Sequence, residues 1–408
     1  MKKLTLIMAF VVLGMAASAQ SINVSNAYEQ QNRGYYKKAM GFIDQAVQHE
    51  QTSTSAQAWF YRTLIYCKIG GEIKNQTKKG KELEVVAANW YREAYISVLN
   101  WQQFDKTGEY TDKITPFIPY IGNVYYDLAD NAFKKQEYDK TIAYCDTAIQ
   151  LFNMGAKANL PLTWFLAGAA AQNSGNNELV KKYFNYLVRN KYDDNQVYET
   201  LFNVYSTEKD TVNAMKVAAQ FKKAFPAKYE AEMLMARGYL MNGNLDKSRE
   251  CMMSATSKVG DDINKKAALL CQIAQIYEVT NEYAEAESKY NESLTLVSNQ
   301  FGANYNMGKM FYNRAVDKLD AANNVDPNDE TGLYDKLNDE AKALFGQTVL
   351  YFNNAIAFID GLPEDQKKHN QANLYNCLNA LKTVYLRLEM TDKFTETNNR
   401  LNSLNVGK

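Results

Sequence analysis

Apolar residues recur along this chain with the spacing of amphipathic helices, and the stretch from Ala267 to Val297 shows this most clearly. Residues at i, i+3, i+4 and i+7 share one face of an α-helix, and here they are Leu270, Ile273, Ala274 and Tyr277. After a polar break at 281–282, a second face carries Tyr283, Ala286, Tyr290 and Leu294. The pattern predicts two helices joined by a short turn, a hairpin of about 34 residues.

The same pair of faces returns along the chain. At spacings of 39, 34, 34, 38 and 34 residues, the small-residue position of the first helix holds Ala129, Gly168, Phe202, Ala236, Ala274 and Gly308. The matching position of the second helix holds Thr141, Val180, Ala214, Ser248 and Ala286. Small residues are expected where paired helices approach to about 8–10 Å. Phe202 opposite Ala214 reverses the usual pairing, so we expect that hairpin to splay.

This pattern resembles the tetratricopeptide repeat, whose first helix carries large, Leu, small and Tyr residues and whose second carries Ala and an aromatic residue. The Tyr position holds Tyr205, Tyr239 and Tyr277, and Pro226 ends a repeat where the family has proline. Arg62 and Thr63 depart from the pattern, because Leu and a small residue are usual there. The resemblance implies an all-α fold, a right-handed superhelical solenoid of about eight or nine stacked hairpins.

Residues 1–19 have the features of a signal peptide. Lys2 and Lys3 precede an apolar run from Leu4 to Met15, and Ala17-Ser18-Ala19 forms an A-x-A cleavage site. The apolar run is too short to span a bilayer, which takes about 20 residues. We therefore expect cleavage after Ala19, no transmembrane segment afterwards, and a soluble protein secreted to the periplasm.

Three further parts are predicted. Residues 20–119 form degenerate hairpins, 120–300 a regular central array, and 301–408 C-terminal hairpins with a polar final face. Gly108, Pro116 and Pro119 are expected to close helices between 103 and 119. Inserts interrupt the pattern at 71–88, which is basic, and at 323–340, where an acidic connection is expected to run from Asp326 to Glu340.

The composition and the motifs of the chain argue against several classes of function. Lys and Arg together number 46, as do Asp and Glu, so no net field favours nucleic acid or an anionic membrane. Only two histidines occur, His49 and His369, and neither is near another histidine or a cysteine. No phosphate-binding glycine motif is present. We therefore expect no enzymatic activity, no metal and no cofactor.

Five cysteines are scattered over predicted helices, at positions 67, 145, 251, 271 and 377. An oxidising compartment permits disulfides, but an odd count leaves at least one thiol unpaired. Buried thiols are the simpler expectation. A bridge between Cys251 and Cys271, in neighbouring hairpins, is the one pairing that the spacing makes worth checking.

The resemblance also implies a concave face lined by the first helices. Ten residues are placed on it, namely Tyr126, Asp130, Phe133, Phe165, Gln172, Asn203, Met233, Arg237, Met241 and Glu278. Aromatic residues, Met and Arg are enriched in the cores of interfaces. The other interpretation is that several of them only fill the inner curve of the solenoid.

These observations favour a non-enzymatic periplasmic scaffold that binds a protein or peptide through its concave face. The alternative is an accessory subunit of an envelope complex that binds glycan or nutrient-uptake machinery.

Overall fold

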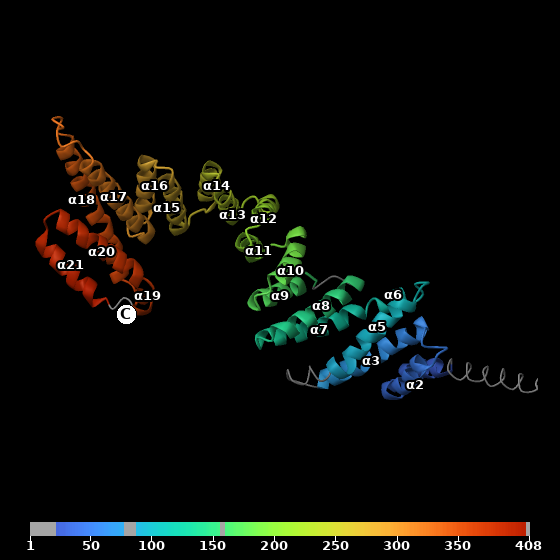
Figure 1. Cartoon of the computed structure of the whole chain (residues 1–408). Coiled ribbons are helices and arrows are strands. Elements are labelled where there is room, and N and C mark those ends of the chain that lie inside the picture. The colour runs from blue at the N-terminus through green and yellow to red at the C-terminus, as the bar shows by residue number, and fades with distance from the viewer. Residues whose placement is uncertain (1–21, 77–86, 156–159, 405–408) are drawn as a thin grey trace, which may run out of the picture. The chain divides into compact units, whose positions relative to one another are not determined.

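A computed structural model of the chain describes residues 22–76, 87–155 and 160–404 (Figure 1). Regular structure in these residues is entirely helical, which confirms the all-α prediction. The predicted signal peptide at 1–19 and most of the basic insert at 71–88 lie outside the described residues. The chain divides into two compact units, Met1–Glu208 (unit 1) and Lys209–Lys408 (unit 2).

Unit 1 begins with helical residues 22–32. The elements that follow are α2 (Tyr36–Gln48), α3 (Ala56–Gln76), the π-helical η1 (Ala87–Tyr91), α5 (Arg92–Phe104), α6 (Thr111–Ile114), α7 (Ile118–Lys134), α8 (Tyr138–Met154), α9 (Leu160–Asn173), α10 (Asn177–Arg189) and α11 (Asn195–Thr207). Consecutive helices pack in pairs, α3 on α5, α7 on α8 and α9 on α10.

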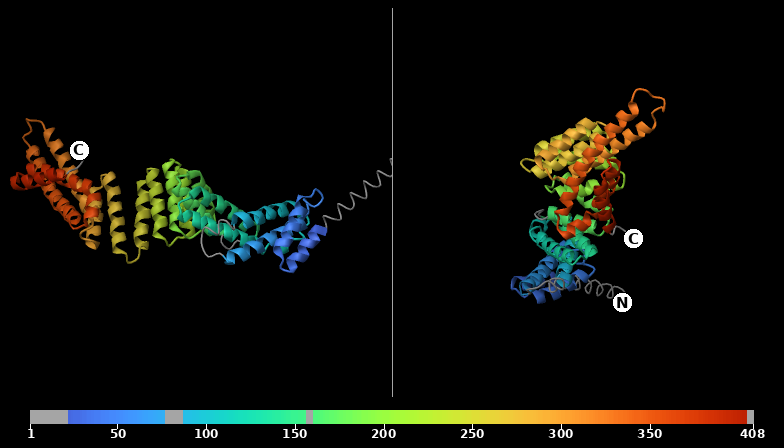
Figure 2. Two further views of the ribbon diagram at one scale, coloured as in Figure 1. Left: turned by 90° about the horizontal axis from the view of Figure 1, so that it is seen from below. Right: turned by 90° about the vertical axis from the view of Figure 1, so that its left-hand side faces the viewer.

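Unit 2 continues the same construction. Its elements are α12 (Thr211–Ala224), α13 (Tyr229–Met241), α14 (Leu245–Lys258), α15 (Ile263–Val279), α16 (Tyr283–Leu296), α17 (Phe301–Asn323), α18 (Leu333–Asp360), α19 (Glu364–His369), α20 (Gln371–Arg387) and α21 (Thr391–Ser403). The pairs α13/α14, α15/α16, α17/α18 and α20/α21 can be followed in Figures 1 and 2. The predicted hairpin at 267–297 is confirmed as α15 and α16.

The small positions lie in the helix crossings, as the spacing indicates. Ala129, Ala236 and Ala274 on first helices have no exposed surface, nor do Thr141, Ala214, Ser248 and Ala286 on second helices. Phe202 is equally buried. The boundary between the units follows Glu208, so the hairpin of Phe202 and Ala214 is divided between them. Its splaying stays a prediction.

Two of these positions require glycine. A Cβ atom at Gly168 would lie 2.1 Å from Cε1 of Phe184, and one at Gly308 would lie 2.6 Å from Cδ1 of Phe352. In each case a buried phenylalanine of the second helix fills the space that a side chain on the first helix would need. The absent side chain is therefore part of the packing, despite the cost of glycine inside a helix.

We expect Gly168→Ala to lower the free energy of unfolding of unit 1 by about 1–2 kcal/mol, because overpacking outweighs the gain in helix propensity. Gly41→Ala in α2 is the matched control, since nothing lies within 4 Å of a Cβ atom there. That change should stabilise by up to about 1 kcal/mol. Urea unfolding of both variants measures the difference, and equal shifts would contradict the packing argument.

Two expectations about connections are wrong. Pro119 lies in the first turn of α7 and does not close a helix, because proline has the φ of a helix start and its missing N–H is not needed there. The stretch Asp326–Glu340 is not all connection, since α18 begins at Leu333. Residues there are polar and largely solvated, so they show no apolar period. Lys318 of α17 instead pairs with Glu340 at 2.6 Å.

The cysteines match the simpler expectation. All five are unpaired and buried, so no bridge joins Cys251 to Cys271. Two helices begin at paired aspartates, Asp193-Asp194 before α11 and Asp261-Asp262 before α15. Asp194 accepts a hydrogen bond from the backbone of Gln196 at 2.8 Å, and Asp262 accepts one from Lys265 at 3.0 Å.

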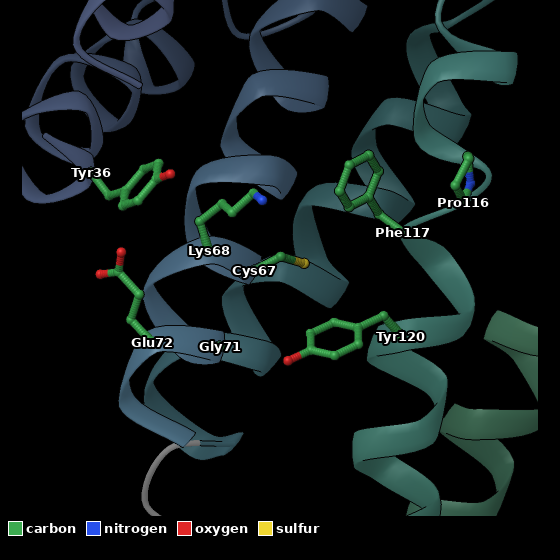
Figure 3. Close-up of a pocket in the computed structure, with 8 residues that line it drawn as sticks. All are labelled: Tyr36, Cys67, Lys68, Gly71, Glu72, Pro116, Phe117 and Tyr120. Atoms are coloured by element: carbon green, nitrogen blue, oxygen red, sulfur yellow. The ribbon is translucent and has the colours of Figure 1, made fainter. Parts of the chain in front are cut away.

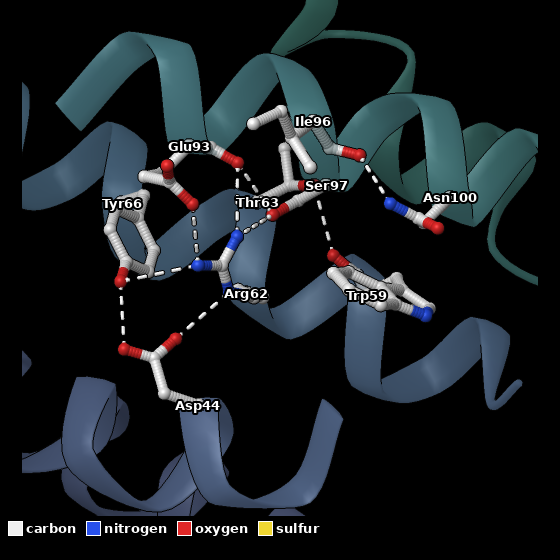
Figure 4. A network of polar contacts seen from close by, with 9 residues as sticks. All are labelled: Asp44, Trp59, Arg62, Thr63, Tyr66, Glu93, Ile96, Ser97 and Asn100. Atoms are coloured by element: carbon white, nitrogen blue, oxygen red, sulfur yellow. Dashed lines mark hydrogen bonds and ion pairs between the residues drawn. The ribbon is translucent and has the colours of Figure 1, made fainter. Parts of the chain in front are cut away.

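Arg62, which replaces the usual Leu, is buried with 8% of its surface exposed. Its guanidinium donates to Asp44 of α2 at 2.8 Å and to Glu93 of α5 at 2.8 Å (Figure 4). It also donates to Ser97 Oγ at 2.8 Å. A buried arginine is tolerated only when its donors are satisfied, and here the partners come from both neighbouring helices. Arg62 therefore links α2, α3 and α5 by polar contacts.

Candidate functional site

The ten residues predicted to line a concave face fall in both units. Unit 1 holds six, on α7 (Tyr126, Asp130, Phe133), α9 (Phe165, Gln172) and α11 (Asn203). Unit 2 holds four, on α13 (Met233, Arg237, Met241) and α15 (Glu278). None of the ten is fully buried.

In unit 1, α7 and α9 contact each other as first helices of consecutive hairpins. The ring of Phe165 on α9 stacks on Phe184 and lies 5.9 Å from the ring of Tyr192. Burial raises the pKa of Tyr126 on α7, and Asp130 and then Tyr192 contribute further through their charges. Phe165 and Tyr192 form a half-exposed ring pair, and Tyr126 is half-exposed on α7, the helix that α9 contacts; we call these three residues the aromatic edge.

Tyr192 was not among the predicted residues. It lies in the connection between α10 and α11, where no helical period marks a residue as facing anything. It also lines a recess of about 190 Å³ with Leu160, Pro161, Tyr186, Leu187 and Asn190. The aromatic edge therefore adjoins a small apolar hollow. The one sequence signal was an aromatic residue directly before the Asp193–Asp194 helix start.

Two other predicted residues of unit 1 have partners within their own hairpin. Asp130 forms an ion pair with Lys134 one turn along α7. The ring of Phe133 meets the ring of Tyr138 of α8 at 5.8 Å. The ion pair is exposed, so it contributes little stability and its charges remain open to solvent.

In unit 2, Met233, Arg237 and Met241 are spaced by four residues and share one face of α13. Met233 is half-buried, whereas Arg237 and Met241 are exposed. We call this face the α13 strip. Sulfur-containing and arginine side chains at an exposed helix face are suited to contact with a partner.

Glu278 has a structural role within its own hairpin. Its carboxylate accepts a hydrogen bond from the hydroxyl of Tyr290, which is completely buried in α16. Burial raises the pKa of Glu278, and this hydrogen bond opposes the rise. The contact joins the two helices of the α15/α16 hairpin, so a partner reaching Glu278 must share it with Tyr290.

In the part of the chain that the structure describes, no three His, Cys, Asp or Glu residues are grouped to hold a metal ion. His369 Nδ1 lies 2.7 Å from the carbonyl oxygen of Asp365, within its own short helix. Of the helices described, none has both the length and the apolar character needed to cross a bilayer.

Successive two-helix hairpins, with small residues or glycine at the crossings, make this chain an array of tetratricopeptide-like repeats. Solved structures similar to it include MamA from Desulfovibrio magneticus RS-1, with 16% sequence identity and a TM-score of 0.36. The match covers 44% of this chain and 96% of the MamA chain. The C-terminal part of a TPR repeat-containing protein from Cytophaga hutchinsonii is 14% identical over 67% of this chain and 95% of its own, with a TM-score of 0.35.

A TPR repeats protein from Bacteroides fragilis is 17% identical over 53% of this chain and 97% of its own, with a TM-score of 0.29. No protein-family model matches the sequence, and no curated protein matches it.

Proposed function

We propose that this protein is a non-enzymatic scaffold that binds a protein or peptide through the faces of its first helices. The aromatic edge carries the proposal. The half-exposed rings of Phe165 and Tyr192 lie 5.9 Å apart, Tyr192 lines an apolar recess, and Tyr126 is half-exposed on the contacting helix α7. Clustered aromatic residues beside a pocket are the usual anchors of protein interfaces. The α13 strip offers a second contact surface on unit 2.

The proposed compartment is the periplasm. Its support is the sequence of residues 1–19, with a positive start, an apolar run and an A-x-A site. Intact mass of the exported protein tests it, because cleavage after Ala19 leaves Gln20 at the N-terminus. A mature chain that keeps Lys2 would overturn this compartment.

Photo-crosslinking tests the binding face. We expect a benzophenone amino acid at Phe165 to crosslink a partner in the native envelope, and the same group at Thr147 of α8, which is half-exposed as Phe165 is, to crosslink none. Titration of that partner should then show binding weakened about tenfold or more by Phe165→Ala, because burial of one aromatic ring contributes about 1.5–3 kcal/mol. Arg237→Ala tests the α13 strip in the same assay.

Two results would contradict this proposed binding face. If Phe165→Ala and Tyr192→Ala bind the crosslinked partner as wild type does, with circular dichroism unchanged, the aromatic edge is not the binding face. Equal crosslinking from Thr147 and Phe165 would show that the contact is unspecific.

A further inference from the structure

Two neighbouring cavities in unit 1 form a cleft across α3 that none of the predicted residues touches. The first, of about 510 Å³, is lined by residues that include Tyr36, Cys67, Gly71, Phe117 and Tyr120. The second, of about 420 Å³, lies between α3 and the start of α2. Both are lined by Tyr36 and Glu72, so they adjoin each other. We call this feature the α3 cleft.

Figure 3 shows how the walls are arranged. Phe117 and Tyr120 lie on one side of α3, and Tyr36 lies on the other side, near Glu72. The walls therefore come from residues about 80 positions apart in the sequence, as Tyr36 and Phe117 are. An extended ligand that crosses α3 would meet both walls.

Gly71 of α3 lines the cleft and leaves space that a larger residue would fill. Gly70 is explained by packing, since a Cβ atom there would lie 2.9 Å from Cε2 of Tyr91. Gly71 has no such backbone or core constraint, and its Cβ atom would meet only the hydroxyl of Tyr120, at 3.2 Å. Glycine inside a helix costs about 1 kcal/mol relative to alanine. A side chain at Gly71 would project into the cleft, so its absence maintains the space.

The polar groups on the walls are held in place. Tyr91, which is completely buried, donates a hydrogen bond to the hydroxyl of Tyr120 at 3.0 Å. Tyr120 accepts that bond and is 39% exposed, so its own proton is available to an acceptor in the cleft. Cys67 is inert here, because burial raises the pKa of its thiol to about 12. Among the described walls, the groups that can contact a ligand are therefore binding groups, and the Cys67 thiol is not a reactive one.

The charged side chains that line the cleft indicate the charge of its ligand. The described residues that line the cleft include three lysines, Lys37, Lys38 and Lys68, against one acid, Glu72. All four are exposed, and Lys68 and Glu72 form no ion pair with each other although they are one turn apart. The first turn of α2, which faces the second cavity, carries no acidic residue. An anionic ligand is therefore favoured at the rim.

Apolar recesses lie between these charges. Ile69 and Ile73 line the second cavity, and Pro116 and Phe117 line the first. Such recesses fit apolar side chains, whereas the hydroxyls of a sugar would lose their water there with few partners. An extended peptide presents apolar and charged side chains in alternation, which matches recesses below a cationic rim.

We propose that the α3 cleft is a second binding site, separate from the aromatic edge, and that it takes an extended acidic peptide segment with aromatic or aliphatic side chains. Carboxylates pair with Lys38 and Lys68 at the rim, and the apolar side chains fill the recesses beside Ile69 and Phe117. Tyr120 donates its hydroxyl proton to a carbonyl oxygen of the peptide.

Selection from a library of short random peptides, displayed on phage and applied to the full chain, tests this. Peptides that bind Gly71→Leu are removed first, because leucine fills the cleft and is a better helix former than glycine. We expect the enriched sequences to be rich in Asp, Glu and apolar residues. One enriched peptide is then synthesised with a fluorescent label and titrated by anisotropy.

We expect Lys68→Glu and Gly71→Leu to weaken its binding about tenfold or more, and raised salt to weaken it as well. Lys106→Glu is the matched control, an exposed lysine of unit 1 outside the cleft, and Phe165→Ala controls for the aromatic edge. Both should bind as wild type does. Unchanged circular dichroism shows that the variants are folded.

Three results would overturn the proposal. The enriched peptides show no excess of acidic residues, or Lys68→Glu binds the chosen peptide as wild type does, or Lys106→Glu weakens binding as much as Lys68→Glu. A titration of labelled oligogalacturonate in parallel distinguishes the other class of ligand. Cleft-dependent binding of that sugar without peptide binding would replace the peptide by an acidic glycan.

Discussion

Arg62→Leu should lower the free energy of unfolding of unit 1 by about 3 kcal/mol, although leucine is the residue that the repeat pattern favours at this position. The substitution leaves Asp44 and Glu93 facing each other across α3 without their shared cation. Removal of one partner from a buried ion pair costs about 3–5 kcal/mol. Their side chains are 29% and 32% exposed, so water reduces the penalty to the lower end of that range.

Tryptophan fluorescence during urea unfolding measures this effect selectively. The four tryptophans, Trp59, Trp90, Trp101 and Trp164, all lie in unit 1. Arg33→Leu is the matched control, because Arg33 pairs with Glu29 on the surface with 60% of its side chain exposed. Its effect should stay under about 1 kcal/mol.

A triple variant separates charge from packing. Adding Asp44→Asn and Glu93→Gln to Arg62→Leu removes the two carboxylates that Arg62 had neutralised, so part of the lost stability should return. If Arg62→Leu alone is as stable as wild type, the polar network contributes nothing to unit 1. If the triple variant is less stable than Arg62→Leu, packing and not charge explains the loss.

Glu232 is a buried charged residue of unit 2 whose removal should lower stability about as much as removal of Arg62 does in unit 1. Its side chain is 2% exposed and lies between Lys258 of α14 at 2.6 Å and Lys222 of α12 at 2.9 Å. Glu232→Ala should lower the stability of this three-helix contact by about 3 kcal/mol, since it leaves two lysines without their anion and opens a cavity. Hydrogen exchange of α13 and α14 measures the loss, because unit 2 contains no tryptophan.

The carboxyl group of Glu232 should also make the stability of unit 2 depend on pH. Burial acts to raise the pKa of Glu232, but hydrogen bonds from Lys258 and Lys222 outweigh it and hold the pKa below its usual value. A carboxyl group with a lowered pKa in the folded state stabilises above its unfolded pKa, and that contribution is lost as the pH falls through the folded value. Exchange protection of α13 should therefore fall as the pH drops below about 4.5.

Glu232→Gln provides the control, because an amide does not titrate. Its protection should start lower and change less over the same acidic interval. An identical acid response in wild type and Glu232→Gln would show that other carboxyl groups cause the loss. Lys216→Ala, an exposed lysine of α12, should leave both the protection and its pH dependence unchanged.

The sequence by itself determined most of the helices, the pairing of those in the regular hairpins and the residues at their crossings. An apolar period of 3.6 residues is a local property, and the distance between paired helices limits the size of the side chain that fits between them. Ala274 and Ala286 are therefore buried where the pattern places them. The residue type at Gly168 and Gly308 follows from the same limit.

The tertiary structure decided what the residues outside that period do. Arg62 is a departure from the pattern in the sequence, and its partners Asp44 and Glu93 are 18 and 31 residues away on other helices. Tyr192 joins the aromatic edge from a connection, where no period exists. The α3 cleft needs Tyr36, Gly71 and Tyr120 brought together from three segments. Such contacts depend on how hairpins pack on one another, and a local pattern carries no information about that packing.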